Sequence, residues 1–157
     1  MSDTTTVPWL VQELAIPTSI DDDDAWALHG VAALERVVML DDWGFDDLAF
    51  PAAQTLVSLR EQRYTARIPL VATHPDRPRD VVGAFFVRVP QVGNTHLTEG
   101  SLLVHPEHRH QGVGSALLAA AEARTRALGR RLLILESDHT SEPDADHRRV
   151  LTTDAPG

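Results

Sequence analysis

A segment in the second half of the chain, 102–118, holds the residues best placed to bind a charged ligand. An apolar run ends at Val104, a polar loop containing Arg109 follows, and Gly112-Val113-Gly114 leads directly into a helical pattern. The first N–H groups of a helix have no internal partners and lie at the positive end of its dipole. Glycines let the backbone approach a ligand, and arginine adds a fixed charge with forked donors. The segment predicts an anion site, although Gly-x-Gly also occurs in simple strand-to-helix turns.

The elements that must position this loop follow from hydrophobic periodicity and turn residues. In the second helix we expect Phe50, Leu56 and Leu59 to face inward, and 41–47 to form a loop before it. Helices on a mostly antiparallel sheet give an α/β (α+β) fold, closed by a right-handed parallel strand–helix–strand crossover. Strands are expected at 9–16, 67–73, 81–89, 96–104 and 132–135, and helices over about 21–38, 48–63 and 112–128.

Composition narrows the classes of function. The chain has 157 residues, the length of one domain, and no apolar run of the ~20 residues that a membrane helix needs. No secretory signal is visible, so a cytoplasmic protein without a membrane partner is expected. Cysteine is absent, which excludes disulfides, thiolate zinc and a cysteine nucleophile. A net charge of −9 argues against nucleic acid and favours a cationic or amine-bearing partner.

The two ends of the chain differ from its middle in composition. Residues 1–8 are mostly polar and are predicted to be flexible. Residues 9–137 contain all the expected strands and helices and form the predicted domain. Residues 138–157 hold few hydrophobic side chains, too few to bury an apolar face, and are predicted to be a disordered polar tail.

The order of elements and the loop sequence together resemble one family. Arg109-His110-Gln111-Gly112-Val113-Gly114 matches the Arg/Gln-x-x-Gly-x-Gly/Ala acyl-CoA motif of the GNAT superfamily, the Gcn5-related N-acetyltransferases. The preceding Val104-His105-Pro106-Glu107-His108 is similar to that family's usual lead-in. The resemblance extends over about 9–136 and implies a GNAT-like sheet flanked by helices.

The resemblance also implies a cosubstrate and a reaction. Acetyl-CoA would bind with its pyrophosphate on the loop and its pantetheine arm along the preceding strand, between two parallel strands that splay apart. The implied reaction transfers the acetyl group to a primary amine of a small molecule or peptide. The implied cosubstrate-binding residues are Leu102, Leu103, Val104, Arg109, His110, Gln111, Gly112, Val113, Gly114 and Ser115.

Attack by an amine on a thioester requires a group that removes a proton and a donor for the developing oxyanion. Glu99 is the first candidate base, directly or through water, because several family members carry an acid at this strand position. A solvated strand carboxylate is the alternative for this residue. His96 is the second candidate, with a simple turn residue as its alternative. The backbone N–H of Val104 or of a neighbour is the expected oxyanion donor.

The chain departs from the family pattern after 136. Family members usually continue with a further helix and two strands, and that helix often carries a tyrosine acid. The only tyrosine here is Tyr64, which we assign to packing, and the domain looks C-terminally abbreviated. The departure motivates an alternative function, a non-catalytic acyl-CoA-binding or interaction module. It also suggests that 132–135 pairs with a second copy, as a homodimer, or with a partner domain, because edge strands are normally covered.

Three histidines near the motif offer another chemistry. Imidazoles of His105, His108 and His110 are of the type that binds zinc, which would suit a metal-dependent hydrolase. They fall inside the predicted phosphate loop, with Pro106 between them, and lack the i, i+4 spacing of a helical metal site. We therefore expect no metal.

Overall fold

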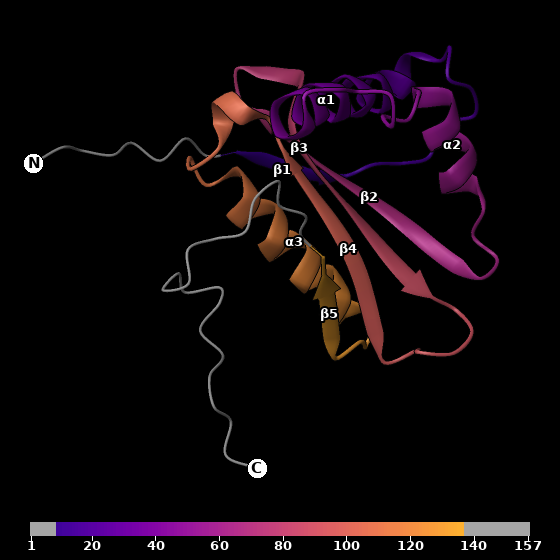
Figure 1. Cartoon of the computed structure of the whole chain (residues 1–157). Coiled ribbons are helices and arrows are strands. Elements are labelled where there is room, and N and C mark those ends of the chain that lie inside the picture. The colour runs from indigo at the N-terminus through magenta and orange to yellow at the C-terminus, as the bar shows by residue number, and fades with distance from the viewer. Residues whose placement is uncertain (1–8, 137–157) are drawn as a thin grey trace, which may run out of the picture.

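A five-stranded sheet forms the centre of the computed structural model, which describes residues 9–136 (Figure 1). Its strands lie in chain order, with the first three pairings antiparallel and the last, β4 with β5, parallel. The mixed, mostly antiparallel sheet and its final crossover are as predicted. The strands are β1 (Leu10–Glu13), β2 (Thr65–His74), β3 (Arg77–Pro90), β4 (Leu97–Val104) and β5 (Leu132–Leu135).

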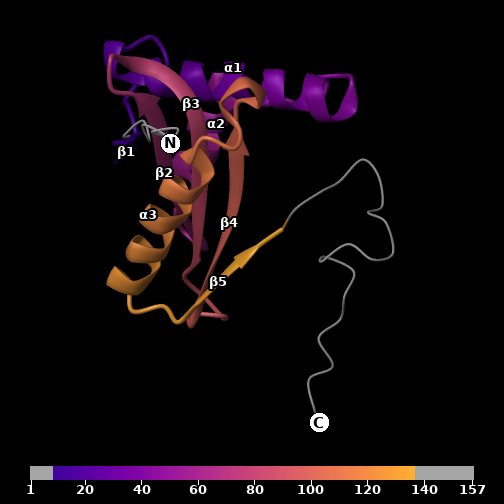
Figure 2. The same ribbon diagram turned by 90° about the vertical axis from the view of Figure 1, so that its left-hand side faces the viewer.

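Helices cover both faces of the sheet. α1 (Trp26–Trp43) and α2 (Ala52–Arg60) pack on one face, and α3 (Val113–Ala127) packs on the other (Figures 1 and 2). Two short 3-10 turns, Asp23–Ala25 and Pro106–His108, precede α1 and α3. The α3 face buries alternate β3 side chains, among them Phe85 and Val87, against Leu117. The strand period of two thus divides the core into two layers, with the sheet between them.

The bounds of α1 and α2 differ from the expected 21–38 and 48–63 at both ends. α1 continues through Asp41 and Asp42, which were expected in a loop, and ends where Gly44 takes a left-handed φ of +78°. α2 starts only at Ala52, and Phe50 lies outside it with 52% of its surface exposed, so the inward packing expected for Phe50 was wrong. Phe50 precedes Pro51, and a following proline disfavours helical backbone because its ring crowds the preceding residue. Leu56 and Leu59 are buried as expected.

β5 pairs with only the first half of β4. Among residues 9–136, their register runs from Leu97–Leu132 to Gly100–Leu135, whereas β4 itself continues to Val104. Figure 2 shows the two strands diverging toward the end of β5. Within 9–136, the last part of β4 therefore has no strand partner on this side, in agreement with the splay that the family resemblance implied and that no sequence pattern reveals.

β5 is the last strand of the sheet in the described part of the chain, and most of its side chains are exposed, including Leu132 and Leu135. None of the helices within 9–136 is long and apolar enough to cross a membrane. The expectations for 1–8 and for a disordered tail at 138–157 lie outside the described residues. The expected C-terminal abbreviation concerns the same region.

Candidate functional site

The loop before α3 has an unusual backbone. His110 and Gly112 both take left-handed conformations, with φ of +58° and +89°. Gly112 occupies the N-cap position of α3 and provides no side-chain cap. The first helical bond of α3 runs from the N–H of Ala116 to the carbonyl of Gly112. The N–H groups of Val113 and its two successors therefore have no partner within the helix and remain available to a ligand.

A shallow hollow of about 250 Å³ lies in front of these N–H groups. A Cβ added to Gly112 would meet no atom within 4 Å, so this glycine is required by its backbone angle and not by crowding. A Cβ on Gly114 would make ordinary contact with Leu102, at 3.5 Å from Cδ2. The left-handed φ therefore accounts for glycine at 112, whereas a Cβ added at 114 would meet only ordinary contacts. The hollow is lined by Val104, Arg109, His110, Gly112, Gly114 and Ser115, all predicted cosubstrate-binding residues.

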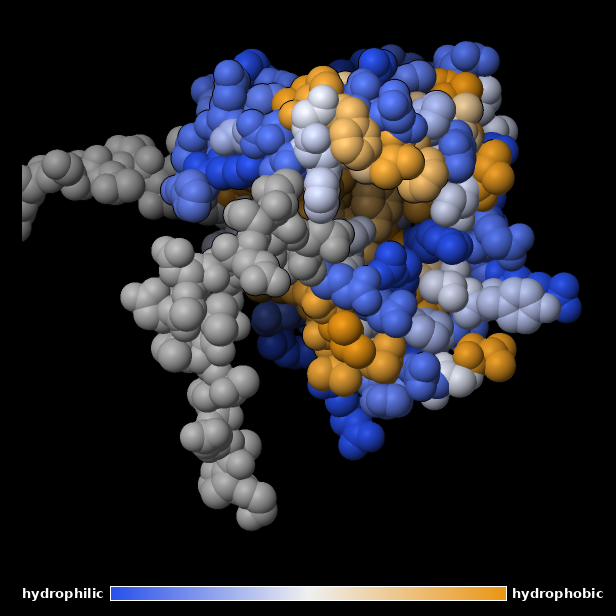
Figure 3. Space-filling model, viewed as in Figure 1, coloured by the Kyte–Doolittle hydropathy of each residue, from blue (hydrophilic) through white to orange (hydrophobic). Residues whose placement is uncertain are grey.

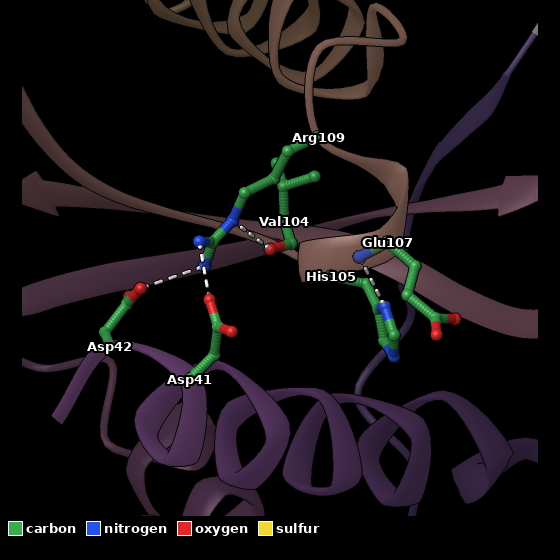
Figure 4. A network of polar contacts seen from close by, with 6 residues as sticks. All are labelled: Asp41, Asp42, Val104, His105, Glu107 and Arg109. Carbon is green, nitrogen blue, oxygen red and sulfur yellow. Dashed lines mark hydrogen bonds and ion pairs between the residues drawn. The ribbon is translucent and has the colours of Figure 1, made fainter. Parts of the chain in front are cut away.

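Arg109 borders the hollow but directs its guanidinium toward α1 (Figure 4). Its Nη1 donates to Asp41 Oδ2 at 2.9 Å and its Nη2 to Asp42 Oδ1 at 3.2 Å. Its Nε donates to the carbonyl of Val104 at 3.3 Å. Two aspartates at a helix C-terminus are unfavourable with the helix dipole, and Arg109 compensates them from across the fold. The residue expected to bind phosphate by charge therefore joins the end of α1 to the end of β4.

Other motif residues hold the loop from outside. Gln111 Nε2 donates to the carbonyl of Glu107 at 2.8 Å, and the carbonyl of Gln111 accepts a bond from Trp9 Nε1 at 2.8 Å. Val113 is buried at 1% exposure in the layer under α3. The side chains of Gln111 and Val113 thus anchor the loop, and only their backbone N–H groups are available to a ligand.

The last part of β4 presents backbone groups on the side away from β3. His105 N–H donates to the carbonyl of Val82, which fixes the alternation of the antiparallel β3–β4 ladder. In such a ladder alternate residues bond to the neighbouring strand and the others point away from it. Leu103 therefore bonds toward β3, while the N–H groups of Leu102 and Val104 point toward the splay. The strand is able to add an extended ligand in the manner of a further strand.

A second and larger cavity, of about 330 Å³, lies on the opposite face of the sheet. It is enclosed by α1, the segment before α2, α2 itself, and the strands β2, β3 and β4. Figure 3 shows a hollow with hydrophobic residues at its floor below α1. Leu103, a predicted cosubstrate-binding residue, lines this cavity. The side chains of Leu102 and Val104 lie on the other face, near Gly114 of α3. The lining residues are Val31, Glu35, Phe50, Gln54, Thr55, Ser58, Leu59, Arg67, Phe86, Arg88, Ser101 and Leu103.

The two candidate bases lie in different places. Glu99 shares a sheet face with Ser101 and Leu103, which line the larger cavity, and its Oε2 lies 3.7 Å from Arg88 Nε. His96 is exposed just before β4 begins, and its carbonyl accepts a bond from Arg131. Four residues of strand, roughly 13 Å, separate His96 from Gly100, where the splay starts. Only Glu99 is close to both the cavity and the splay.

Glu35 of α1 is a cavity residue that sequence reasoning missed. Burial raises the pKa of its carboxyl group, and a hydrogen bond from the N–H of Phe50 to Oε2, at 3.1 Å, lowers the pKa in part. A glutamate at an ordinary position of an amphipathic helix gives no signal in the sequence. Only the position of α2 and of the Phe50 backbone N–H beside this face of α1 makes the residue distinctive.

The histidines pack around Trp9 instead of converging on one point. The Trp9 ring lies 5.5 Å from the His108 ring and 5.6 Å from the His74 ring, measured between centroids. His105 Nδ1 accepts a hydrogen bond from the N–H of Glu107 (Figure 4). Among residues 9–136, no group of three or more histidine, aspartate or glutamate side chains is arranged to hold a metal ion.

Tyr64 was assigned to packing, but its side chain does not lie in the core. Its side chain is 60% exposed, and the guanidinium of Arg63 lies 5.0 Å from its ring centroid. It follows α2 and does not line either cavity.

Comparison with protein families now identifies the class of protein. The model of the acetyltransferase (GNAT) family matches residues 37–148, which is more than half of the chain. The chain therefore belongs to the GNAT acetyltransferase family, a family that uses acetyl-CoA. A comparison with curated protein sequences finds no significant match.

Solved structures show the same fold at low sequence identity. A putative acetyltransferase, YncA, from Salmonella typhimurium with its cofactor acetyl-CoA is 16% identical with a TM-score of 0.60, covering 81% of this chain and 68% of that one. An aminoglycoside acetyltransferase from an uncultured soil metagenomic sample, in complex with sisomicin, is 19% identical with a TM-score of 0.59, covering 83% and 78%. A ribosomal-protein-alanine N-acetyltransferase from Brucella melitensis is 17% identical with a TM-score of 0.55, covering 95% of each chain.

Proposed function

We propose that this protein transfers an acetyl group from acetyl-CoA to a primary amine of a small molecule or peptide. The observation that carries the proposal is that the hollow at α3 adjoins the end of β4, which beyond Gly100 has no strand partner on this side within 9–136. The residues present fit the cosubstrate. Unpaired N–H groups from Val113 to Ser115 suit a diphosphate, and the edge of Leu102 and Val104 suits an extended pantetheine arm.

The cosubstrate supplies a thioester: the amine nitrogen bonds to the acetyl carbon, the carbon–sulfur bond breaks, and the sulfur leaves as the thiolate of coenzyme A, which takes up a proton from solvent. The chain supplies the groups around that exchange. Glu99 accepts the proton that the amine loses, directly or through water. The N–H of Val104 donates to the carbonyl oxygen as its negative charge grows. We propose Glu99 ahead of His96 as the base, because His96 lies at the far end of β4.

The acceptor is a small molecule or a peptide amine. Structural neighbours include an acetyltransferase of aminoglycosides and one of a ribosomal protein, which supports both classes. An acidic chain with a net charge of −9 attracts cationic acceptors over a long range. Pairing of β5 with a second copy or a partner domain stays a prediction, which light scattering would test.

The alternative is a module that binds acyl-CoA without turnover. The last part of β4 and the hollow at α3 suit binding alone equally well, so the two functions must be separated by experiment. The first measurement is a thermal shift with coenzyme A. A ligand at 100 times its Kd raises the free energy of unfolding by about 2.7 kcal/mol. No rise in Tm at millimolar coenzyme A would contradict both functions.

The second measurement is thiol release from acetyl-CoA in the presence of a panel of primary amines. We expect amine-dependent release, together with a mass increase of one acetyl group on the acceptor. Binding of coenzyme A without release by any amine, small or peptide, would support the non-catalytic module instead.

A further inference from the structure

The larger cavity combines apolar walls with one acidic group. Its volume of about 330 Å³ lies near the lower end of the ~300–1,000 Å³ range for small-molecule sites. Besides Glu35 and two arginines, the lining includes the polar residues Gln54, Thr55, Ser58 and Ser101, and the rest of the wall is made by five apolar side chains. These are Val31, Phe50, Leu59, Phe86 and Leu103. The cavity is therefore suited to a compact ligand with an apolar body.

The Glu35 carboxylate is the one acidic group among the residues that line this cavity, and it has unused bonding capacity. Its Oε2 accepts one bond from the N–H of Phe50, and within 9–136 Glu35 forms no ion pair. The Glu35 side chain is half-buried, and partial removal from water penalises its ionised form. A cationic ligand would provide an ionic partner.

The two arginines that line the cavity are engaged elsewhere. One Nη of Arg67 donates to three backbone carbonyls around the end of α2, those of Ser58, Glu61 and Thr65. Arg88 faces Glu99 across the β3–β4 ladder, with 3.7 Å between Nε and Oε2. Within 9–136 Arg67 forms no ion pair either, but its Nη1 is directed to carbonyls at the end of α2, whereas Glu35 accepts a single bond.

We infer that the acceptor amine enters this cavity as an ammonium ion on a compact apolar body, with Glu35 as its ionic contact. The inference rests on the proposed function and narrows its acceptor. It assigns Glu35 to recognition and leaves proton removal to Glu99. The raised pKa of Glu35 is consistent with a carboxylate that lacks a counter-charge.

The test uses a ligand that cannot react. N,N,N-trimethyl-2-phenylethylammonium has the charge and shape of an arylalkyl ammonium but no N–H, so calorimetry with the full chain measures binding alone. We expect it to bind more tightly than 3-phenyl-1-propanol or 3-phenylpropanoate, which share the apolar body but are neutral or anionic. Tighter binding of the anion would overturn the inference, because the arginines would then determine specificity.

Two substitutions separate charge from shape. Glu35→Gln keeps an acceptor for the Phe50 N–H but removes the charge, and we expect it to weaken ammonium binding about tenfold or more. Phe50→Ala keeps the backbone N–H and removes part of the wall, and we expect a several-fold loss. Glu122→Gln is the matched control, because Glu122 pairs with Arg126 on the other face, and should bind as the unaltered chain does.

Coenzyme A binding, measured in parallel, distinguishes the two failures. Normal coenzyme A binding with no effect of Glu35→Gln on the ammonium would overturn the inference and leave the proposed function standing. Loss of coenzyme A binding in the unaltered chain would overturn the proposed function itself.

Discussion

The hollows on the two faces of the sheet are built in different ways. The smaller one comes from one continuous segment, from the end of β4 to the start of α3, and offers mainly backbone N–H groups. The larger one gathers side chains from helices and strands on the other face, and its charge comes from Glu35. Backbone donors depend on conformation, whereas a side-chain site depends on the identity of each residue. Substitutions should therefore affect binding in the first through φ angles and in the second through charge and volume.

The largest expected effect concerns proton removal by Glu99, which lies beside the larger cavity. Glu99→Gln should lower kcat about 100-fold, the lower range for loss of a general base, with unchanged affinity for coenzyme A. His96→Gln should leave kcat near that of the unaltered enzyme, because His96 lies at the other end of β4. Steady-state kinetics with pH profiles on the best acceptor would measure both. A larger loss of kcat in the histidine variant would reverse the order of the two candidates.

The next effect tests the backbone hollow. Gly112→Ala places a Cβ on a left-handed residue, a strain of about 1–2 kcal/mol, and should weaken coenzyme A binding by roughly tenfold as the loop relaxes. Gly114→Ala is the control, since its new Cβ meets only ordinary contacts. Calorimetry and thermal unfolding would give both quantities. Equal losses in the two variants would show that crowding, and not φ, governs this loop.

Arg109 connects the two regions, and its removal should have an intermediate effect on stability. Arg109→Ala leaves Asp41 and Asp42 without a counter-charge at a helix C-terminus, and should cost about 1 kcal/mol in the free energy of unfolding. Asp41→Asn with Asp42→Asn is the complementary variant. If the arginine variant instead lost coenzyme A affinity steeply and in a salt-dependent way, the guanidinium would be a direct phosphate ligand.

The smallest expected effect is the pH dependence caused by Glu35. Its folded-state pKa is raised, so between the unfolded and folded pKa values the native state holds more protons than the unfolded chain. The stability of the native chain relative to Glu35→Gln should therefore fall as pH rises through this window, and remain lower at neutral pH. Thermal unfolding of both proteins from pH 4 to 7 would measure the difference. An opposite slope would show that the Phe50 hydrogen bond outweighs burial.

The chain itself determined the order of elements and the cosubstrate loop. Val, Phe and Leu alternation predicts the central strands, and the loop motif followed by an apolar stripe predicts α3 and its free N–H groups. Both signals are local, since hydrophobic period and turn chemistry act over a few neighbouring residues. For the same reason 132–135 was predicted with the bounds that β5 has.

Only the tertiary structure decided the rest. The splay at Gly100, the pairing of Arg109 with Asp41 and Asp42, and the cavity around Glu35 all depend on residues distant in sequence. α1 continues through two aspartates because a cation from across the fold compensates them, and this information is absent from the local sequence. Glu35 is partly withdrawn from water because segments distant in sequence pack beside it, and such packing is a property of the folded chain alone.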